Sequence, residues 1–425
     1  MKSYREPSRS EWESICRRPS SDNPAVRDIV SGIINRVRRD GDKALEELSS
    51  EIDGFIPESL RTSEDEIALA CSQVSEKVKR AVAVAAADIK AFHSAQMPSR
   101  IEVETVPGVT CIQKPVPISN VGLYIPGGTA PLFSTVLMLA IPAQIAGCSR
   151  TVLCTPAGKD GKIAPAVLYA AHFCGIKDIF KVGGAQAVAA MAFGTQSIPK
   201  VDKIFGPGNQ FVTTAKQMLG GNTVAIDMPA GPSEVMVIAD RSSDPSFAAA
   251  DLLSQAEHGN DSQVVLVCND EEFEKEVLKQ IELQTASLGR KNFAENALSK
   301  SCAVIFSKKE DIIDFANCYA PEHLIISTAD AWDIAESITA AGSVFVGQYT
   351  PESAGDYASG TNHTLPTCGW ARSFSGVNID SYMRKMTLQS ATRQGLEALA
   401  STITDMAEAE GLQAHANAVT VRLRK

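Results

Sequence analysis

Short apolar runs alternate with helical patterns through the middle of the chain. The runs lie at 150–156, 177–183, 200–208 and 222–231, and the segments between them have the apolar spacing of helices. Alternation of this kind is typical of a parallel sheet whose two faces are covered by helices. We therefore predict an α/β unit in this part of the chain.

A second series of the same kind follows. Its apolar runs lie at 234–240, 263–270, 302–307, 322–327 and 342–347, again with helical segments between them. A chain of 425 residues with 44% hydrophobic content is too long for one core, because a domain usually holds about 100 to 200 residues. We expect two α/β units side by side.

The two ends of the chain have different patterns. Residues 1–23 are polar and precede the first helical pattern, so we expect an arm that lies outside the core. The C-terminal tail is helical, and its apolar residues Leu396, Leu399, Ile403 and Met406 share one helix face. That face requires a partner surface, either on the same chain or on a second subunit.

Composition and charge exclude several classes of protein. The net charge of −10 arises from 50 acidic and 40 basic residues without a long basic run, so we expect no nucleic acid partner. The ten cysteines form no CxxC pair, which predicts reduced thiols in a cytoplasmic protein. The N-terminus lacks the apolar core of a signal peptide. The most apolar stretch, 130–147, is interrupted by Pro142, so it has no unbroken run of the roughly 18 to 20 residues that cross a membrane, and we expect a buried helix and no membrane partner.

The stretch LLSQAEHGND contains a candidate metal or substrate site at the end of a predicted helix. Gln255 and His258 are three residues apart, so both side chains share one helix face and can reach the same ligand. A histidine in the last turn followed by Gly259 is also what a helix end prefers without any ligand. Taken alone, the stretch favours the structural explanation.

Two Gly-rich turns each join a predicted strand to a helix. They are FGPGNQ at 205–210 and YIPGGTAP at 124–131. Glycines there let backbone N–H groups approach a phosphate at the helix N-terminus. The first turn lacks the G-x-G-x-x-G spacing and the acidic residue after the next strand, so a tight structural turn explains it equally well.

Adjacent acidic and imidazole groups suggest proton transfer at a second place. Glu322 and His323 begin a predicted central strand, and a carboxylate beside an imidazole can move protons near neutral pH. Functional residues in parallel sheets more often follow the carboxyl ends of strands, which counts against this pair.

Asp356 lies in a Gly-rich loop, where aspartate either forms a turn or binds zinc. Glu410 and His415 near the C-terminus have the pattern of a solvated helix end.

Taken together, these strings resemble one known family. FGPGNQFV, AIDMPAGPSEV, DLLSQAEHG, YAPEHL, GSVFVGQYTPESAGDYASGTNH and GLQAHA occur in this order over nearly the whole chain, and they resemble the histidinol dehydrogenase family. The resemblance implies a cytoplasmic, homodimeric oxidoreductase with one zinc ion per subunit. Such an enzyme converts L-histidinol into L-histidine, the last steps of histidine biosynthesis, in two NAD-dependent oxidations through L-histidinal. The implied fold has two incomplete Rossmann-like α/β domains with parallel sheets, plus small N- and C-terminal helical segments exchanged across the dimer.

The resemblance also assigns roles to individual residues. Glu322 and His323 match the acid/base pair of the family. The positions that match zinc ligands are Gln255, His258 and Asp356 from one subunit and His415 from its partner. The positions that match substrate contacts are Ser233, Gln255, His258, His323, Asp356, Glu410 and His415. The positions that match NAD contacts are Tyr124, Gln186 and Asn209.

The domain division implied by the resemblance is discontinuous. We expect an N-terminal arm at 1–23, a first α/β domain built from 24–128 and 235–377, a second α/β domain at 129–234, and a C-terminal tail at 378–425 that contacts the partner subunit. Asn260 stands where the family more often has proline, and we expect this change to affect only the turn.

Alternative functions and an alternative chemistry are left open by the residues alone. The two alternatives are a relative of the same fold that oxidises another small alcohol, such as a sulfonated diol, and an inactive paralogue that binds a nucleotide or metal; both are less favoured than histidinol dehydrogenase. Glu410 and the GLQAHA string favour histidinol over another alcohol, and no ligand or base is missing. Oxidation of an aldehyde can also use a thiolate. Cys111 and Cys154 are the thiols nearest the Gly-rich turns, but neither has a neighbouring histidine, so we interpret both as packing residues.

Overall fold

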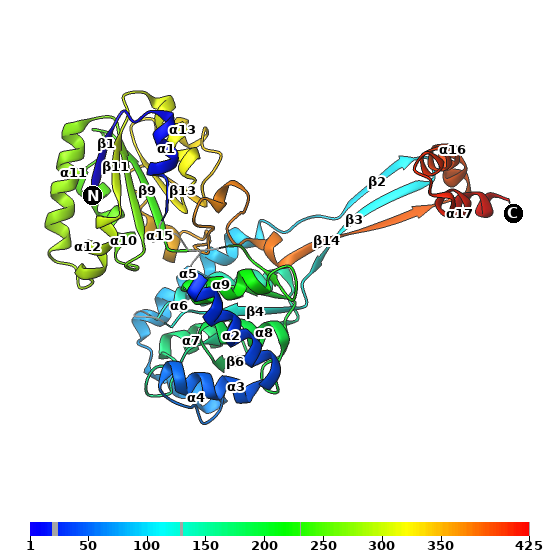
Figure 1. Cartoon of the computed structure of the whole chain (residues 1–425), viewed down its shortest axis with the longest axis horizontal. Coiled ribbons are helices and arrows are strands. Elements are labelled where there is room, and N and C mark those ends of the chain that lie inside the picture. Colours follow the sequence, from blue (N-terminus) through cyan, green and yellow to red (C-terminus); the bar gives the residue numbers. More distant parts are fainter. Residues whose placement is uncertain (19–23, 128–130, 230, 425) are drawn as a thin grey trace.

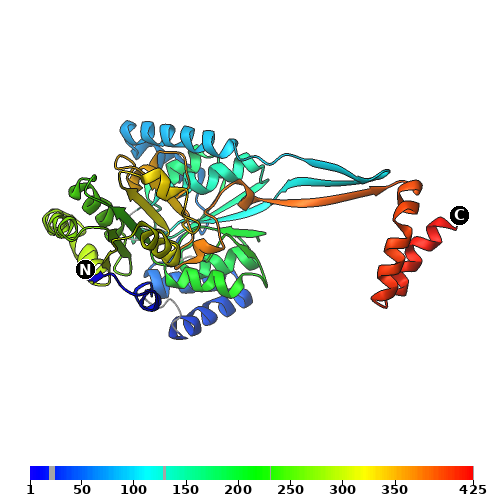
Figure 2. The same cartoon turned by 90° about the horizontal axis from the view of Figure 1, so that it is seen from above.

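Two parallel sheets with their helices and one long arm make up the molecule (Figure 1). The computed structural model describes residues 1–18, 24–127, 131–229 and 231–424. The arm projects away from the two α/β units, and the C-terminal helices lie at its tip (Figures 1 and 2). The prediction of an α/β fold with two parallel sheets is confirmed.

The first unit is built on a five-stranded parallel sheet. In spatial order its strands are β6 (Asp178–Lys181), β5 (Arg150–Thr155), β4 (Asn120–Tyr124), β7 (Lys203–Phe205) and β8 (Ala225–Ile226). Its helices are α2 (Pro24–Asp40), α3 (Asp42–Leu48), α4 (Glu64–Gln73), α5 (Glu76–Ser94), α6 (Phe133–Ala146), α7 (Pro165–Phe173), α8 (Gly184–Phe193) and α9 (Gln210–Leu219), with a π-helical turn at Ser49–Asp53. Helix α2 packs on α8 and α9, α4 on α7, and α5 on α6.

The second unit is built on a six-stranded parallel sheet. In spatial order its strands are β1 (Lys2–Arg5), β11 (Cys302–Ile305), β10 (Gln263–Cys268), β9 (Glu234–Ala239), β12 (His323–Ser327) and β13 (Ser343–Val346). Its helices are α1 (Arg9–Ile15), α10 (Pro245–Ala256), α11 (Glu271–Thr285), α12 (Lys291–Ser299), α13 (Lys309–Tyr319), α14 (Ala331–Ala335) and α15 (Glu352–Tyr357). Every residue of β9, β10 and β12 is buried, which explains why these strands are continuous apolar runs.

The arm is a three-stranded antiparallel ribbon. Its strands are β14 (Met383–Ala391), β3 (Val109–Pro117) and β2 (Ile101–Val106) in that order. Two 3-10 turns, Trp370–Arg372 and Ile379–Tyr382, precede β14, and α16 (Arg393–Ala409) and α17 (Gln413–Leu423) follow it. The two helices pack on each other at the tip of the ribbon (Figure 2).

The N-terminal segment belongs to a core, contrary to our expectation of an arm. Strand β1 pairs in parallel with β11, and Trp12 packs edge-on against Phe306 and Phe315 with ring centroids 5.6 and 5.5 Å apart. Trp12, Ile15 and Cys16 are buried. The polar pattern was misleading because β1 is an edge strand and its residues are mostly exposed. Residues 19–23 lie outside the described residues.

The observed division of the chain also differs from the expected one. Residues 24–128 were expected to share a domain with 235–377, but β4 is the middle strand of the five-stranded sheet and α2 to α5 cover that sheet. The segment 101–117 joins neither sheet and forms the arm with β14. Apolar periodicity shows where strands are, but it does not show which sheet each strand enters.

Most of the apolar stretch 130–147 becomes α6 (Phe133–Ala146), and most residues of this helix are buried although Pro142 lies inside it. Within the described part of the chain, none of the helices combines the length and apolar character that a bilayer crossing needs. The expected buried helix is therefore confirmed.

Candidate active site

The amino edge of the six-stranded sheet carries a buried group of ionisable side chains. His323 is the first residue of β12 and is 4% exposed; Glu322, directly before it, is 7% exposed. Helix α13 ends at Ala320 in a left-handed conformation (φ 52°), and this sharp turn leads the chain back into β12. Ser233 precedes β9, the neighbouring strand, and lies at the same edge.

Three carboxylates surround the imidazole of His323. Its Nδ1 lies 3.6 Å from Glu322 Oε2 and 3.7 Å from Glu352 Oε1, and its Nε2 lies 3.6 Å from Asp356 Oδ1. Glu352 and Asp356 are four residues apart on α15, so both side chains point to the same side of that short helix.

Burial and charge set the protonation of this group. Burial by itself lowers the pKa of His323, but the carboxylates of Glu352 and Glu322 and the contact with Asp356 outweigh it and raise this pKa well above its ordinary value. Burial raises the pKa of Glu322, and it raises the pKa of Glu352 to about 8. Strongly perturbed groups of this kind are characteristic of functional sites.

Gln255 joins the group from the last turn of α10. Its Nε2 lies 3.1 Å from His323 Nδ1 and donates a hydrogen bond to the backbone oxygen of Glu234 at 3.2 Å. Helix α10 ends at Ala256, so exposed His258 follows the helix, and Gly259 is not left-handed. The structural explanation of the LLSQAEHGND stretch loses its support, since no glycine cap is formed there.

Polar atoms without partners indicate that a ligand belongs in this group. Gln255 Oε1, His323 Nε2 and Glu352 Oε1 are buried and have no hydrogen-bond partner within the described chain. Ligand atoms of His323, Glu352 and Asp356 all lie within 4.8 Å of one another. Because buried polar atoms are costly unless paired, such a set of N and O donors fits a divalent metal ion.

The predicted ligand set and this observed group overlap without being identical. Asp356 is common to both, and Gln255 contacts the group directly. The charges of Asp356 and His258 act on each other, which places the imidazole of His258 near the carboxylate. Glu352 was not predicted; its spacing of four from Asp356 in ESAGD is the signal that sequence reasoning missed.

The backbone of Glu234 holds Glu322, and the side chain of Glu234 is itself held by an ion pair. The backbone N–H of Glu234 donates to Glu322 Oε2 at 2.8 Å. The carboxylate of Glu234 receives two hydrogen bonds of 3.0 Å from Arg18, whose guanidinium also lies over the ring of Tyr319. Sequence reasoning missed Arg18 and Glu234, because the two residues are far apart in the chain and no periodicity joins them.

The residues expected to contact NAD lie together at the carboxyl edge of the five-stranded sheet. Tyr124 ends β4, and its hydroxyl accepts a hydrogen bond from the N–H of Gly184 at 3.1 Å. Burial raises the pKa of Tyr124 to about 12. Gln186 is buried in the first turn of α8, and Asn209 caps α9 through hydrogen bonds that its Oδ1 accepts from Phe211 and Val212.

This edge has the topology of a ligand-binding crevice. The connections from β4 and from β7 leave in opposite directions, and ligands bind at such switch points in open α/β sheets. Gly206 has φ 123°, and a Cβ there would lie 2.1 Å from the backbone oxygen of Tyr124, so glycine is required for the close approach. The second Gly-rich turn, at 124–131, lies partly outside the described residues.

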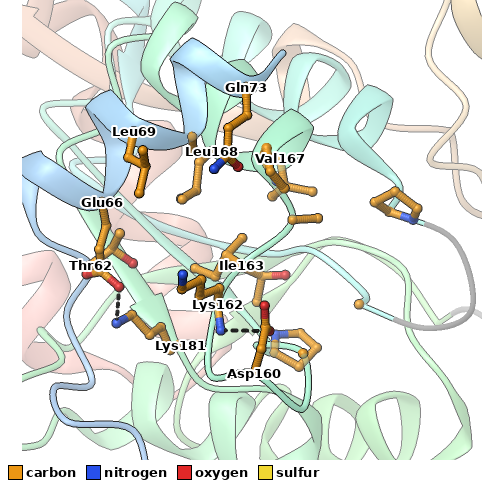
Figure 3. Close-up of a pocket in the computed structure, with 18 of the residues that line it drawn as sticks. Thr62, Glu66, Leu69, Gln73, Asp160, Lys162, Ile163, Val167, Leu168 and Lys181 are labelled. Atoms are coloured by element: carbon orange, nitrogen blue, oxygen red, sulfur yellow. Dashed lines mark hydrogen bonds and ion pairs between the residues drawn. The ribbon is translucent and has the colours of Figure 1, made fainter.

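A cavity of about 370 Å³ lies beside this crevice (Figure 3). It is enclosed by α4, α7 and the ends of β5 and β6. Leu69, Val167 and Leu168 form its apolar side, and the ion pair between Lys181 and Glu66 (2.5 Å) lies at its polar side. The volume is within the range of small-molecule sites.

Two predicted site residues are not brought to this group within one chain. Glu410 and His415 are exposed and lie with α16 and α17 at the far end of the arm (Figures 1 and 2). Of the two candidate thiols, Cys154 is buried in the core of the five-stranded unit and Cys111 lies in β3 of the arm. Burial raises the pKa of Cys154, which suits packing and not nucleophilic attack.

Comparison with known proteins gives a consistent result. The family model described as histidinol dehydrogenase matches residues 16–423. A histidinol dehydrogenase of Bacteroides fragilis (strain YCH46) is 54% identical over 425 residues, covering 100% of this chain and 99% of that protein; one of Escherichia coli (strain K12) is 51% identical over 412 residues, covering 96% and 94%. The crystal structure of histidinol dehydrogenase from Elizabethkingia anophelis matches with a TM-score of 0.97 and 50% identity, covering 100% of this chain and 98% of that one. With this match along its length, the chain belongs to the histidinol dehydrogenase family.

Proposed function

We propose that this oxidoreductase converts L-histidinol into L-histidine through L-histidinal, in two NAD-dependent steps at a zinc site, and so completes histidine biosynthesis. Family membership supports histidinol as the compound that is oxidised. The observation that carries the proposal is the buried pair of unpartnered atoms, Gln255 Oε1 and His323 Nε2, in one group with Asp356.

Gln255, His258 and Asp356 would hold the zinc ion, with a fourth ligand from His415 of a second chain. Zinc would supply positive charge that binds the amine and imidazole nitrogens of histidinol, holds the carbinol carbon in place and opposes the carboxylates that keep His323 protonated. The exposed position of His258 leaves this ligand set open to a residue from outside the chain.

His323 and Glu322 would carry the proton transfers. His323 takes the hydroxyl proton at Nε2 during the first oxidation, because that atom is buried and has no hydrogen-bond partner among the described residues. Glu322 then removes a proton from the water that adds to the aldehyde. His323 acts again as the base when the hydrated carbon is oxidised, so one imidazole serves both steps.

NAD would lie along the carboxyl edge of the five-stranded sheet and accept a hydride in each oxidation. Tyr124, Gln186 and Asn209 would contact it near the switch point, and the cavity between α4 and α7 has the volume and apolar wall that suit its adenosine half.

The two edges meet through the N-terminal turn of α6. Thr135 Oγ1 lies 3.1 Å from His363 Nε2, and His363 Nδ1 lies 3.0 Å from the backbone oxygen of Asp356. This chain of contacts supports the proposal that a nicotinamide at the first edge reaches a substrate at the second.

The site would be shared between the subunits of a homodimer, with His415 and Glu410 supplied by the partner's tail. The arm and its tip expose apolar side chains that a partner can cover. These are Ile101, Val103, Met386, Leu388, Met406 and Leu412. Exchange of the N-terminal segment is not part of the proposal, since β1 pairs within its own chain.

We place the enzyme in the cytoplasm, because all ten cysteines are unpaired, as in a reducing compartment. Family membership favours histidinol over another alcohol. The buried group around His323 keeps the residues that the proposal needs from this chain, which argues against an inactive paralogue.

The test is the yield of NADH per molecule of limiting L-histidinol, measured with and without a chelator. Two NADH per histidinol, abolished by chelation and restored by zinc, is the expected result. One NADH per molecule, or activity that survives full removal of metal, contradicts the proposal.

A further inference from the structure

The two ring nitrogens of His323 have different surroundings. Its Nε2 is buried without a hydrogen-bond partner in the described chain, and Asp356 Oδ1 lies 3.6 Å from it. Its Nδ1 is crowded by four polar atoms. They are Gln255 Nε2 at 3.1 Å, the backbone oxygen of Glu234 at 3.3 Å, Glu322 Oε2 at 3.6 Å and Glu352 Oε1 at 3.7 Å.

These four atoms compete for the tautomer of the ring. The amide N–H of Gln255 favours an unprotonated Nδ1, which would place the proton on Nε2 and remove the base from the substrate side. The three oxygens favour a proton on Nδ1, which leaves Nε2 free to accept one. Whether His323 can work as a base therefore depends on the oxygens outcompeting Gln255.

Two of the three oxygens are already occupied. Glu322 Oε2 accepts the N–H of Glu234 at 2.8 Å and faces Gln255 Nε2 at 3.5 Å, and the backbone oxygen of Glu234 accepts from Gln255 at 3.2 Å. Glu352 Oε1 has no hydrogen-bond partner in the described chain, and Glu352 is 1% exposed. The other oxygen of Glu352 accepts a weak bond from Ser254 Oγ at 3.3 Å.

We propose that Glu352 is the positioning residue of His323: its Oε1 accepts the Nδ1 proton and so fixes the tautomer in which Nε2 is the base. The 3.7 Å separation is longer than a hydrogen bond and closes with a small turn of either side chain, as catalytic contacts commonly do once substrate binds. The inference rests on the proposed function, because it presumes that His323 is the base of that reaction.

A ligand role for Glu352 is the competing explanation. Its carboxylate lies within 4.8 Å of donor atoms of His323 and Asp356, close enough to bind the same ion. The two roles differ in what the glutamate holds. A positioning residue leaves metal and substrate binding intact when it is replaced, whereas a ligand does not.

The test is Glu352→Gln, which keeps the volume but replaces one carboxyl oxygen with an amide N–H that cannot accept the Nδ1 proton. We expect zinc content, histidinol binding by calorimetry without NAD, and the KM for histidinol to stay close to wild type. We expect kcat to fall about 10²- to 10⁴-fold, the range for loss of a base or of the group that orients it. The loss must be equal when the reaction starts from histidinol and when it starts from histidinal, since His323 serves both steps.

Three further variants complete the experiment. Glu322→Gln should slow mainly the oxidation of histidinal, which separates a water-activating carboxylate from a positioning one. Glu352→Asp keeps a carboxyl group on a shorter side chain and should recover part of kcat. This variant keeps the inference testable if Glu352→Gln fails to fold. Ser254→Ala removes the contact on the other oxygen of Glu352 and should keep kcat within about threefold, because a weak hydrogen bond is lost.

Loss of zinc from Glu352→Gln would show that Glu352 is a ligand and would overturn the inference. An unchanged kcat in Glu352→Gln would also overturn it, as would a kcat of Glu352→Asp no higher than that of Glu352→Gln. The NADH stoichiometry of the wild-type enzyme is measured in parallel. Failure of that stoichiometry rejects the proposed function itself, whereas failure of the Glu352 variants with two NADH in wild type rejects only the positioning role.

Discussion

The two parallel sheets have the same strand order around their switch points but place their functional residues at opposite edges. In the five-stranded sheet, β4 lies between β5 and β7, and in the six-stranded sheet β9 lies between β10 and β12. The proposed NAD contacts follow the carboxyl ends of strands, as usual in such folds. The proposed catalytic group, with His323 and Glu322, lies at the amino ends.

The carboxyl edge of the six-stranded sheet also has a hollow, lined by Ser243, Thr328 and Tyr349 among others, but the side chains around it do not suit a dinucleotide. The turn after β9 has Asp240 and Arg241 in place of glycines. Asp270 follows β10, where dinucleotide-binding folds carry a ribose-binding acid, but it pairs with Arg241 at 2.8 Å and caps α11. The comparison teaches that strand order locates a possible crevice, whereas the side chains decide which edge is used.

The largest expected effect comes from the base at the amino edge. His323→Asn removes the only imidazole that faces three carboxylates in the described chain, so we expect kcat to fall at least about 10²- to 10⁴-fold. Zinc content should be retained, because none of the proposed ligands is altered. Histidinol affinity should fall far less than kcat, because asparagine keeps a polar group in place of the imidazole. Steady-state kinetics with metal analysis checks this.

A kcat of His323→Asn equal to that of wild type would show that the amino edge does not take part in the chemistry. The proposed contrast between the two sheets would then be wrong. A matched control is His172→Asn, which changes a histidine on α7 of the other unit. That variant should keep the kcat of wild type.

A second test asks whether the amino edge is complete within one chain. His258→Asn and His415→Asn should each lose zinc and most activity, since His258 lies beside the group and His415 lies at the tip of the arm. Co-expression of the two variants should restore one intact site per heterodimer, or about a quarter of all sites after random pairing in a twofold dimer. Zinc per subunit and activity are measured on the purified mixture.

No recovery in that mixture contradicts a ligand that crosses between subunits. Recovery above the level expected for one site in each heterodimer also contradicts it, because the other site then carries both substitutions.

Much of this contrast was accessible from the sequence, and the reasons for the rest are physical. Strands that are mostly or fully buried, such as β5 in one sheet and β9 and β10 in the other, are continuous apolar runs, so both sheets were predicted. The edge strand β1 and the ribbon strand β2 are mostly exposed, and the ribbon strand β3 is mostly half-buried, so none of them has such a run. The N-terminal segment and the arm were therefore misjudged.

The site followed the same rule. Glu322 and His323 are neighbours in sequence and were found. Three further residues act on this pair only through the tertiary fold. Glu352 is 29 positions from His323, and Glu234 is 88 positions from Glu322. Arg18 is 216 positions from Glu234. The family resemblance supplied the residue roles that spacing alone left open.

At the carboxyl edge, a smaller effect is expected from Asn209→Asp. The new carboxylate still caps α9, since aspartate and asparagine cap helices equally well, but it loses the amide donor and adds negative charge where the pyrophosphate of NAD would lie. We expect the KM for NAD to rise about tenfold, which corresponds to about 1.4 kcal/mol. Histidinol binding and melting temperature should not change.

Initial rates at varied NAD measure this effect, and Asn209→Ser is the matched control, because it caps the helix without charge. A rise in the KM for histidinol alone would place Asn209 at the wrong edge.

The smallest effect is expected in the wall of the cavity beside that edge, where Lys181 is 7% exposed and Glu66 is 36% exposed. Glu66→Gln leaves the buried ammonium of Lys181 without its partner. Because water screens the half-open carboxylate, we expect about 1 to 2 kcal/mol of lost stability at pH 7, less than the loss for a fully buried pair.

The pH dependence gives this last prediction its sign. Burial by itself raises the pKa of Glu66, but the hydrogen bonds from Lys181 and Ser63 outweigh it and lower this pKa below its ordinary value of 4.5. A lowered pKa in the folded state means that the pair stabilises the fold above pH 4.5 and loses its effect as the pH falls through the folded value. The difference in urea unfolding between wild type and Glu66→Gln should therefore shrink from pH 7 to pH 4. The prediction is wrong if the difference in stability grows as the pH falls, or if Glu66→Gln changes kcat for histidinal. Either result would show that the cavity wall is coupled to the amino edge of the other sheet and that the two edges are not separate.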